Sequence, residues 1–403
     1  MALIVMKFGG TSVADAERVE RVAWTIAETY TEGNDVVVVL SAQGSMTDDL
    51  IEKAKEINPD PSKREMDVLL STGEQISIAL MSMALEKIGL PAVSLTGWQI
   101  GMQTNSDYGN ARVKKVSCER IKTELDRRRI VLVAGFQGVN KYDDITTLGR
   151  GGSDTTAVAI AAALHADLCK IFTDVEGVYT SDPNKIPNAR KLEEITYDEM
   201  LELSSLGAQV LHNRSVEMAK RYGVDMEVLS SFVRKPGTKV KEVTKVEQSK
   251  IAGVAKDAKI ARIALVGLQD EPGVAFKIFR VLAKAKINVD IILQSIGRDN
   301  SKDISFTVSK NDMDMATKLL EESKETLGFS SISVTDKIAK VSIVGASMMS
   351  ASGVAAMMFE ALFDAKINIG MISTSEIKIS VLVDEKDGDR AVEAIHAKFF
   401  ESQ

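Results

Sequence analysis

Two glycine-rich segments of this sequence carry charged and hydroxyl side chains in an order that suits the binding of phosphate or carboxylate groups. The first, at 7–12, reads Lys-Phe-Gly-Gly-Thr-Ser and follows an apolar run. Gly9 and Gly10 let the backbone approach an anion closely, and Lys7 adds a positive charge; backbone amides at a following helix start would complete a phosphate cradle. The segment lacks the P-loop spacing. Taken alone, it is equally compatible with a tight turn beside a surface lysine.

The second segment, at 146–156, reads Thr-Thr-Leu-Gly-Arg-Gly-Gly-Ser-Asp-Thr-Thr and precedes an alanine-rich run. The planar guanidinium of Arg150 can bind a carboxylate or a phosphate through two parallel hydrogen bonds. Ser153, Asp154 and Thr155 can cap the helix that follows. Capping does not explain the glycines at 149, 151 and 152, so ligand binding is the better interpretation.

Two further polar segments adjoin predicted helices or strands. The segment at 71–75, Ser-Thr-Gly-Glu-Gln, precedes an apolar helix. Glu74 there suits the positive end of the helix dipole, and beside the other segments it could bind a substrate ammonium group. The segment at 173–183 follows a predicted strand, and its polar groups can border a nucleotide or form a loop shaped by Gly177 and Pro183.

The elements that must position these segments alternate between strands and helices over residues 1–235. The runs at 36–40 and 130–134 are apolar, as in strands buried on both faces, whereas 18–30 and 157–166 have helical character. This alternation predicts an α/β fold, a three-layer αβα domain with a largely parallel sheet. Ligands of such folds bind at the carboxyl ends of the strands, where the glycine-rich segments lie.

The C-terminal part of the chain contains an internal repeat. The string Ala-Lys-Ile-Asn at 285–288 recurs at 365–368, and each copy has a Gly-Val upstream that opens a helix and an apolar run downstream. A charged, apolar-poor stretch at 234–250 separates the repeat from the first domain and is the expected hinge. We expect a catalytic domain at 1–240 and two ferredoxin-like α+β modules at 250–335 and 336–403, with strand exchange between the modules allowed.

Composition excludes several other classes of protein. The formal net charge of −7 gives no broad basic field for nucleic acid. The two cysteines and three histidines suggest neither a disulfide framework nor a zinc site. The apolar runs at 36–40 and 157–164 are far shorter than the ~20 residues of a membrane span. We therefore expect a cytoplasmic protein that binds neither nucleic acid nor membrane.

The polar segments together, in this order, resemble the amino-acid-kinase family. The strings at 7–12, 71–74, 149–154 and 173–179 are most similar to members that phosphorylate the side-chain carboxylate of aspartate, and the repeat resembles paired ACT modules that bind end-product amino acids. The resemblance covers nearly the whole chain. It implies the first step of lysine, threonine and methionine biosynthesis, with L-aspartate as substrate, ATP with Mg²⁺ as co-substrate, and no permanently bound cofactor or protein metal site.

The resemblance also implies roles for individual residues, in which Glu74 takes the ammonium group and Arg150 a carboxylate of aspartate. The residues implied in catalysis are Lys7, Arg150 and Asp154. The residues implied in substrate binding are Ser41, Thr47, Glu74, Arg150 and Ser153. The residues implied in nucleotide binding are Lys7, Gly9, Gly10, Thr173, Asp174, Tyr179 and Gln209.

In the repeat, the resemblance implies binding of lysine, threonine or both, and a homo-oligomer formed through the modules. One implied effector site contains Asp270, Gly273, Ala275, Gln294, Asn368 and Ile369. A lysine-like site contains Asp290, Ser375 and Glu376. The alternative is that these are edge and turn residues of two packed modules.

The sequence departs from the family pattern in three places in its kinase part. Gln43 and Met46 stand in the loop after the second strand, and Gln209 replaces a lysine that reaches the nucleotide. Asn184 follows Asp182 and Pro183, where the family often has an arginine. A neutral amide brings no charge to a phosphate, so weaker nucleotide binding is expected. The alternatives are an amino-acid kinase acting on glutamate, acetylglutamate or a nucleotide, and a catalytically weak amino-acid sensor of the same fold.

Overall fold

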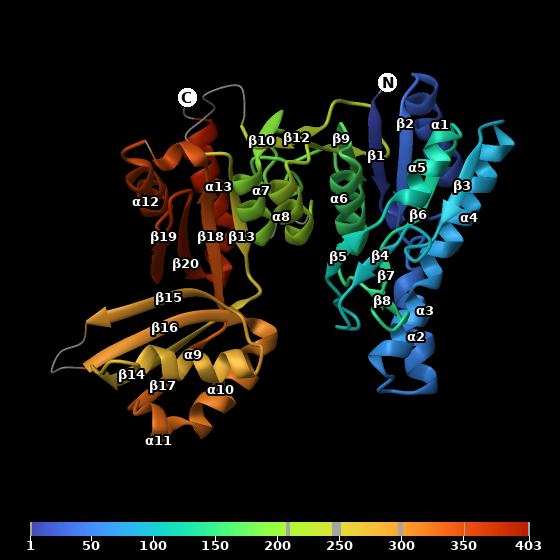
Figure 1. The fold of residues 1–403 in the computed structure, drawn as a ribbon. Helices are drawn as coiled ribbons and strands as arrows, with labels where there is room; N and C mark the ends of the chain where they lie inside the picture. The colour runs from blue at the N-terminus through green and yellow to red at the C-terminus, as the bar shows by residue number, and fades with distance from the viewer. Residues whose placement is uncertain (1, 207–209, 244–250, 297–300, 350, 402–403) are drawn as a thin grey trace. The chain divides into compact units, whose positions relative to one another are not determined.

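The computed structural model describes residues 2–206, 210–243, 251–296, 301–349 and 351–401. These residues form two compact units (Figure 1). The first unit runs from the N-terminus to Tyr179 and resumes at Lys191. The second contains Thr180–Arg190 and the C-terminal part of the chain.

The first unit is built on an eight-stranded sheet with the strand order β10-β12-β11-β9-β1-β2-β6-β3. Neighbouring strands are parallel, except that β11 and β12 are antiparallel. The central strands are apolar and buried, as the sequence predicts. The strands are β1 (Leu3–Phe8), β2 (Asp35–Leu40), β3 (Ala92–Leu95), β6 (Ile130–Ala134), β9 (Leu168–Thr173), β10 (Glu194–Thr196), β11 (Met226–Ser230) and β12 (Thr238–Lys241).

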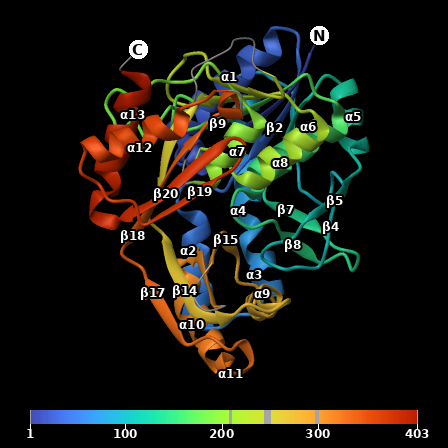
Figure 2. The same ribbon diagram turned by 90° about the vertical axis from the view of Figure 1, so that its left-hand side faces the viewer.

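Helices cover both faces of this sheet, which confirms the three-layer α/β fold (Figures 1 and 2). Alternate residues of β1, such as Met6 and Phe8, share a core with α1 and α4, whereas α6 packs on the opposite face against β1, β2 and β9. The alanines of α6 allow it to lie close to the sheet. The helices of this unit are α1 (Ala16–Thr31), α2 (Met46–Ile57), α3 (Lys63–Leu70), α4 (Thr72–Lys87), α5 (Glu119–Asp126), α6 (Gly152–Leu164), α7 (Tyr197–Ser205) and α8 (Asn213–Tyr222).

A second, four-stranded sheet of the first unit lies next to α3. Its strand order is β5-β4-β7-β8, and β8 leads directly into the glycine-rich segment before α6. The strands are β4 (Met102–Thr104), β5 (Val113–Val116), β7 (Gln137–Val139) and β8 (Ile145–Thr147).

By length and composition alone, one helical stretch of the described residues, Lys63–Lys87, could cross a membrane. This stretch consists of α3 and α4, which meet at Ser71. Met81 and Leu85 of α4 belong to the core that packs on the sheet. One side of α4 therefore packs in the core of the first unit.

The second unit contains two antiparallel four-stranded sheets, with the orders β15-β16-β14-β17 and β13-β18-β20-β19. β13 precedes β14 in the chain but pairs with β18 in the other sheet. The strands are β13 (Gly253–Asp257), β14 (Ile260–Gln269), β15 (Val289–Ile296), β16 (Ser301–Ser309), β17 (Ser331–Thr335), β18 (Ile338–Val344), β19 (Met371–Thr374) and β20 (Lys378–Asp384).

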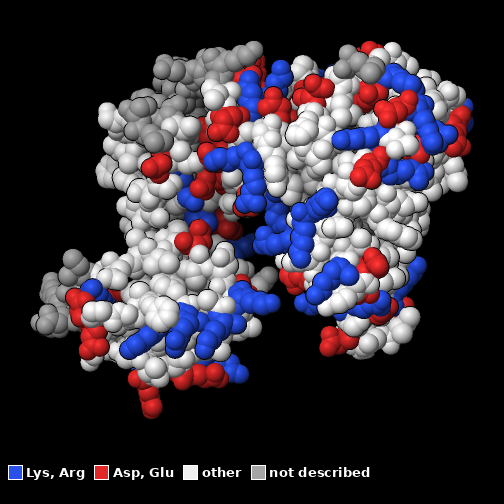
Figure 3. Space-filling model, viewed as in Figure 1, with Lys and Arg blue, Asp and Glu red and all other residues white. Residues whose placement is uncertain are grey.

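Four longer helices and one short helix complete these two α+β modules. The longer helices are α9 (Val274–Lys284), α10 (Met313–Glu322), α12 (Val354–Asp364) and α13 (Gly388–Phe400), and the short one is α11 (Lys324–Leu327). Short 3-10 turns of the chain are η1 (Gly10–Val13), η2 (Lys310–Asp312), η3 (Ala346–Met349) and η4 (Glu385–Asp387). Basic side chains gather over α9, where Lys277, Arg280 and Lys284 are exposed (Figure 3).

The sequence repeat corresponds to a structural repeat. Gly273 and Gly353 each lie directly before a helix, and both have positive φ, 96° and 87°. Lys286 and Lys366 both adopt the left-handed region, with φ of 60° and 55°. Equivalent backbone conformations at equivalent positions indicate two copies of one module.

The segment Thr180–Arg190 packs entirely within the second unit, although it interrupts the first in sequence. Ile186 is buried in the core formed by α12, α13, β18 and β20. The Thr180 hydroxyl lies 2.9 Å from His396 Nε2, and the Val254 amide donates to the Thr180 carbonyl at 2.8 Å. The chain between two strands of the first unit is thus anchored in the C-terminal core.

Two predicted elements differ in extent from the structure. The helix expected at 157–166 begins at Gly152, so Ser153 to Thr155 lie in its first turn rather than before it. The charged stretch at 234–250 contains β12, whose buried residues Thr238 and Val240 pair with β11.

Candidate active site

The carboxyl ends of four parallel strands meet at one edge of the large sheet. Phe8 of β1 lies opposite Leu40 of β2 and Phe172 of β9, and Leu40 lies opposite Ala134 of β6. The residues that follow these positions, Gly9, Ser41, Gly135 and Thr173, therefore share this edge. Two of the polar segments found in the sequence begin here, as the parallel topology predicts.

Lys7 and Asp154 form an ion pair at this edge. The Lys7 ammonium lies 2.6 Å from Asp154 Oδ1, and both side chains are almost buried. Lys7 comes from the end of β1 and Asp154 from the first turn of α6, which packs on that face of the sheet. Asp154 thereby holds the ammonium group beside Gly9, whose missing Cβ would lie 3.6 Å from Lys7 Nζ.

Glu74, in the first turn of α4, carries a buried carboxylate that is only partly satisfied. Glu74 is 3% exposed, and its Oε1 accepts a hydrogen bond from the Ala42 amide at 3.2 Å. Oε2 is buried, and among the described residues it has no hydrogen-bond partner. Burial raises the pKa of Glu74 to about 8, and the backbone hydrogen bonds offset only part of this effect.

The loops after β1 and β2 are joined closely, which places Ser41 and Thr47 near the same edge. The Gly44 amide donates to the Gly10 carbonyl at 3.1 Å, and a Cβ on Gly10 would lie 2.4 Å from the Ala42 carbonyl oxygen. Gln43, which departs from the family pattern, donates to the Val13 carbonyl at 2.6 Å. Its amide therefore ties the two loops together.

Thr47 lies in the first turn of α2, and Ser41 follows β2 directly. Both side chains are half-buried. The short loop between Ser41 and Thr47 contains Ala42, whose amide donates to Glu74. The structure thus gathers three of the predicted substrate-binding residues, Ser41, Thr47 and Glu74, around this loop.

The glycine-rich segment before α6 turns sharply to present Arg150. Gly151 is the N-cap of α6 with φ of 65°, in the left-handed region that favours glycine. A Cβ on Gly151 would also lie 2.3 Å from His212 Cβ. Arg150 is exposed, whereas Ser153 is buried beside Gly135, whose Cβ would lie 2.6 Å from the serine hydroxyl.

Three of the predicted nucleotide residues, Thr173, Asp174 and Tyr179, lie at or after the end of β9. The Thr173 hydroxyl donates to Asp174 at 3.0 Å, and Tyr179 forms an isolated bridge with Lys191. Burial, followed by the nearby charge of Glu176, raises the pKa of Tyr179, so its hydroxyl remains a donor at neutral pH. Gln209 lies outside the described residues.

The predicted effector residues lie in turns and strands of the second unit. Asp270, Gly273 and Ala275 lie around the start of α9, Asp290 and Gln294 on β15, and Asn368 and Ile369 between α12 and β19; Ser375 and Glu376 follow β19. Two of the carboxylates are already paired. Lys302 lies 2.5 Å from Asp270, and the buried Lys340 contacts Asp290.

Sequence reasoning missed three residues that contact the glycine-rich segment. His212 packs against Gly151, and Asp67 and Arg214 bind the backbone just before it. Asp67 comes from the middle of α3 and Arg214 from α8. Their sequence neighbourhoods are those of ordinary helices, so no motif marks them.

The described residues contain no group of three His, Cys, Asp or Glu side chains placed to hold a metal ion. Cys118 and Cys169 are both buried and free. Burial raises the pKa of the Cys118 thiol to about 11 and raises that of Cys169 as well. Neither is therefore a thiolate at neutral pH.

The chain thus combines an α/β domain that carries glycine-rich loops at its sheet edge with two α+β modules. The amino acid kinase family model matches residues 2–230, and the ACT domain model matches residues 263–323 and 341–399. The chain belongs to the amino acid kinase family.

Relatives and solved structures agree with this assignment. An aspartokinase of Mycolicibacterium smegmatis is 51% identical over 99% of this chain and 96% of its own length. The structure of E. coli aspartokinase III in complex with aspartate and ADP is 27% identical, with a TM-score of 0.83, over 99% of this chain and 100% of that one. The same enzyme in complex with lysine and aspartate gives a TM-score of 0.77 at 27% identity, over 99% of both chains.

Proposed function

We propose that this protein transfers the γ-phosphoryl group of ATP to the side-chain carboxylate of L-aspartate, giving 4-phospho-L-aspartate and ADP. The observation that carries the proposal is a buried carboxyl oxygen of Glu74, which no group in the described part of the chain hydrogen-bonds, at the sheet edge that also holds the Lys7–Asp154 pair. A buried carboxyl group that loses its proton when ligand binds suits an incoming ammonium group, and an almost buried lysine suits a phosphate. Similarity to aspartokinases supports this choice of substrate.

The chemistry requires positioning and charge stabilisation rather than a general base. A carboxylate with a pKa near 3.9 is already ionised at neutral pH and can attack phosphorus directly. A carboxylate oxygen forms the new P–O bond while the bond from the γ-phosphorus to the bridging oxygen of ADP breaks. Mg²⁺ enters with ATP as part of the co-substrate, bound mainly by phosphate oxygens and water.

We assign roles to the site residues from their positions. Glu74 binds the ammonium group of aspartate, Arg150 binds a carboxylate, and Asp154 orients Lys7 toward the transferring phosphate. Ser41, Thr47 and Ser153 complete the aspartate site. Gly9 and Gly10 admit the phosphates, and Thr173, Asp174 and Tyr179, together with Gln209, border the nucleotide.

We further propose that the chain is organised as a kinase domain at 1–240 and two ACT modules at 250–335 and 336–403, with β13 exchanged into the second sheet. The modules bind lysine, threonine or both, at the sites around Asp270 and Asp290, and associate as a homo-oligomer. Bound effector would then limit the first step of lysine, threonine and methionine biosynthesis. As a soluble biosynthetic enzyme, the protein is expected in the cytoplasm.

The anchored segment Thr180–Arg190 offers a route for this regulation. Tyr179, on the nucleotide side, is followed immediately by Thr180, which hydrogen-bonds within the second unit. A change in the core around Ile186 would be transmitted along the segment to Thr180, which is bonded directly to Tyr179. Such a route requires two states with different effector affinity.

A hydroxamate assay with L-aspartate and MgATP tests the proposed activity. We expect ATP-dependent formation of aspartyl hydroxamate and its inhibition by lysine, threonine or the pair. Glutamate, acetylglutamate and nucleoside monophosphates serve as competing acceptors. If one of these is phosphorylated and aspartate is not, the proposed substrate is wrong. Lack of any product, with lysine or threonine still raising the melting temperature, would indicate an amino-acid sensor.

A further inference from the structure

A buried carboxylate and a half-buried guanidinium hold the backbone that leads into the Gly149–Asp154 loop. Asp67 Oδ2 accepts hydrogen bonds from the Thr147 amide at 2.9 Å and from the Gly109 amide at 3.0 Å. Asp67 Oδ1 accepts one from the Thr147 hydroxyl at 2.6 Å. The residue is only 1% exposed, so this carboxylate is committed to the two backbone segments that it joins.

Arg214 binds the same two segments through their carbonyl oxygens. Its guanidinium donates to the Leu148 carbonyl at 2.5 Å and to the Ala111 carbonyl at 2.7 Å. A third hydrogen bond, of 3.2 Å, reaches the side-chain oxygen of Asn110. Burial lowers the pKa of Arg214, and the nearby Arg112 acts in the same direction, so desolvation of this cation has a cost.

The two contacts are complementary. The carboxylate takes amide hydrogens of Gly109 and Thr147, and the guanidinium donates to carbonyls of Ala111 and Leu148, one or two residues further along each segment. The segments also pair with each other, because the Ala111 amide donates to the Thr147 carbonyl at 2.8 Å. Two opposite charges thus fix one pair of backbone segments.

The loop that follows needs this fixed origin. Gly149 and Gly151 both adopt positive φ, 77° and 65°. Because the loop begins after Leu148, a small rotation there changes the direction of the residues that follow. Gly151 packs against His212, two residues before Arg214, so α8 supports the loop at both points. The loop carries Arg150 and Ser153 and ends at Asp154, the partner of Lys7.

We propose that Asp67 and Arg214 are positioning residues for phosphoryl transfer, which together fix the Gly149–Asp154 loop so that Arg150 and Ser153 meet the substrate amino acid. Neither residue touches substrate. The inference rests on the proposed function for the role of Arg150, but the clamp itself is a property of the loop and can be measured separately.

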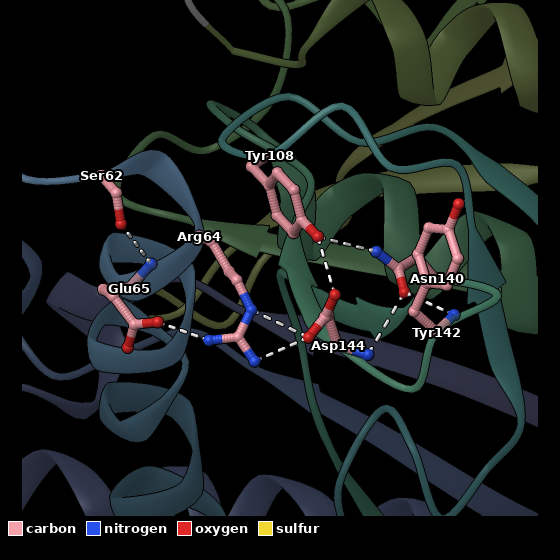
Figure 4. A network of polar contacts seen from close by, with 7 residues as sticks. All are labelled: Ser62, Arg64, Glu65, Tyr108, Asn140, Tyr142 and Asp144. Carbon is pink, nitrogen blue, oxygen red and sulfur yellow. Dashed lines mark hydrogen bonds and ion pairs between the residues drawn. The ribbon is translucent and has the colours of Figure 1, made fainter.

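A nearby ion pair provides a matched control. Arg64, on the same helix as Asp67, donates to Asp144 from Nε at 2.9 Å and from Nη2 at 2.7 Å (Figure 4). Asp144 also accepts from the Tyr108 hydroxyl at 2.8 Å. This network joins α3 to Asp144, the residue before β8, whereas Asp67 joins α3 to Thr147 at the end of β8. Arg64 makes its contacts at a more exposed position. Arg64→Met therefore removes a comparable tether and leaves the Thr147 contacts in place.

The kinetic test compares Asp67→Asn and Arg214→Met with Arg64→Met and wild type. We expect the KM for aspartate to rise at least about tenfold in the two clamp variants, with the KM for ATP within about twofold, because misplacement of a binding group by about 1 Å can cost up to about a hundredfold. The double variant should be less impaired than the product of the single effects, since both substitutions release the same loop. A parallel rise in both KM values, or an equal effect of Arg64→Met, would overturn the proposal.

Hydrogen exchange of the peptide covering 147–154 gives a readout that does not need activity. We expect faster exchange in Asp67→Asn and Arg214→Met than in Arg64→Met, in protein that remains folded by circular dichroism. If Asp67→Asn does not fold, Arg214→Lys, which keeps the charge but loses the fork, replaces it. Unchanged exchange in the clamp variants refutes the clamp even if the wild-type enzyme phosphorylates aspartate. Faster exchange in a protein that does not phosphorylate aspartate would support the clamp and refute the proposed function.

Discussion

Replacing Glu74 by glutamine tests how far this buried carboxylate lowers the stability of the protein and how far it contributes to aspartate binding. The amide oxygen of glutamine can still accept from the Ala42 amide, so the substitution changes charge with little change in shape. Because burial raises the pKa of Glu74 to about 8, the native state binds a proton more tightly than the unfolded chain does. The carboxylate therefore destabilises the ligand-free protein at neutral and alkaline pH.

The sign and size follow from proton linkage. Below the ordinary pKa of 4.5 both states are protonated and the group contributes nothing. As pH rises from 4.5 to about 8, wild-type stability falls by about 1.4 kcal/mol per pH unit, and above about 8 the loss is constant. Over the whole interval the loss reaches about 5 kcal/mol at most. Glu74→Gln should therefore be more stable than wild type at pH 8.5 and equally stable at pH 4.

Thermal unfolding at pH 4, 6 and 8.5 measures this difference, with Glu86→Gln, an exposed position on the same helix, as the control. A gain of 1 kcal/mol corresponds to about 2–4 °C in a domain of this size. Calorimetric titration with aspartate measures the binding side. In wild type, the affinity for aspartate should rise about tenfold per pH unit up to about pH 8, because binding of the ammonium group requires loss of the Glu74 proton. Glu74→Gln should abolish this dependence and most of the affinity.

Two results would refute this reasoning. A stability gain of Glu74→Gln that is the same at pH 4 and pH 8.5 would show that the charge of Glu74 is not what destabilises the native state. Aspartate affinity that remains high and pH-dependent in Glu74→Gln would show that another group binds the ammonium. The first result concerns burial and the second concerns function, so the two can be told apart.

Three further substitutions test other parts of the structure. Gly151→Ala should lower kcat/KM for aspartate by about a hundredfold, because a Cβ there meets His212 and the φ of 65° is strained; Gly89→Ala, with φ of 80° and open space, is the control that should leave kinetics unchanged. Ile186→Ala should weaken inhibition by lysine or threonine while basal turnover persists, since it opens a cavity where the inserted segment is anchored; an unchanged inhibition constant contradicts the proposed route. Glu124→Gln should lower the free energy of unfolding by about 1–3 kcal/mol in urea titrations, because Glu124 is buried against Arg120 and Arg129; a changed KM would show that this cluster also serves the active site.

Much of the fold could be predicted from the sequence because its signals are local. The apolar runs of β2 and β6 are buried on both faces, and the glycine-rich segments lie at strand ends as expected. Lys7 and Asp154, predicted from separate segments, meet because β1 ends where α6 begins to pack on the sheet. The start of α6 was placed too late, because glycines and polar residues mark a loop in sequence but here form a first helical turn.

The parts that could not be predicted depend on contacts between distant segments. Asp67 lies 80 positions from Thr147, and Arg214 lies 66 positions from Leu148. The insertion of Thr180–Arg190 into the second unit depends on one buried isoleucine and a few hydrogen bonds that no local pattern encodes. Equally, Asp270 and Asp290 read in sequence as free carboxylates, whereas lysines of the same unit already pair with them.

The buried charges around the glycine-rich loop are more easily explained by function than by stability. Glu74 and Asp67 both have a raised pKa because they are removed from water, and Arg214 has a lowered one for the same reason. Apolar residues at such positions are often neutral or stabilising in other proteins. Within the described ranges one oxygen of Glu74 has no hydrogen-bond partner, but Asp67 and Arg214 are satisfied by backbone groups that lead to Arg150. The free energy spent on burying these charges falls on Glu74, which is proposed to bind the ligand, and on Asp67 and Arg214, which orient Arg150. A preorganised binding site requires such a loss of stability.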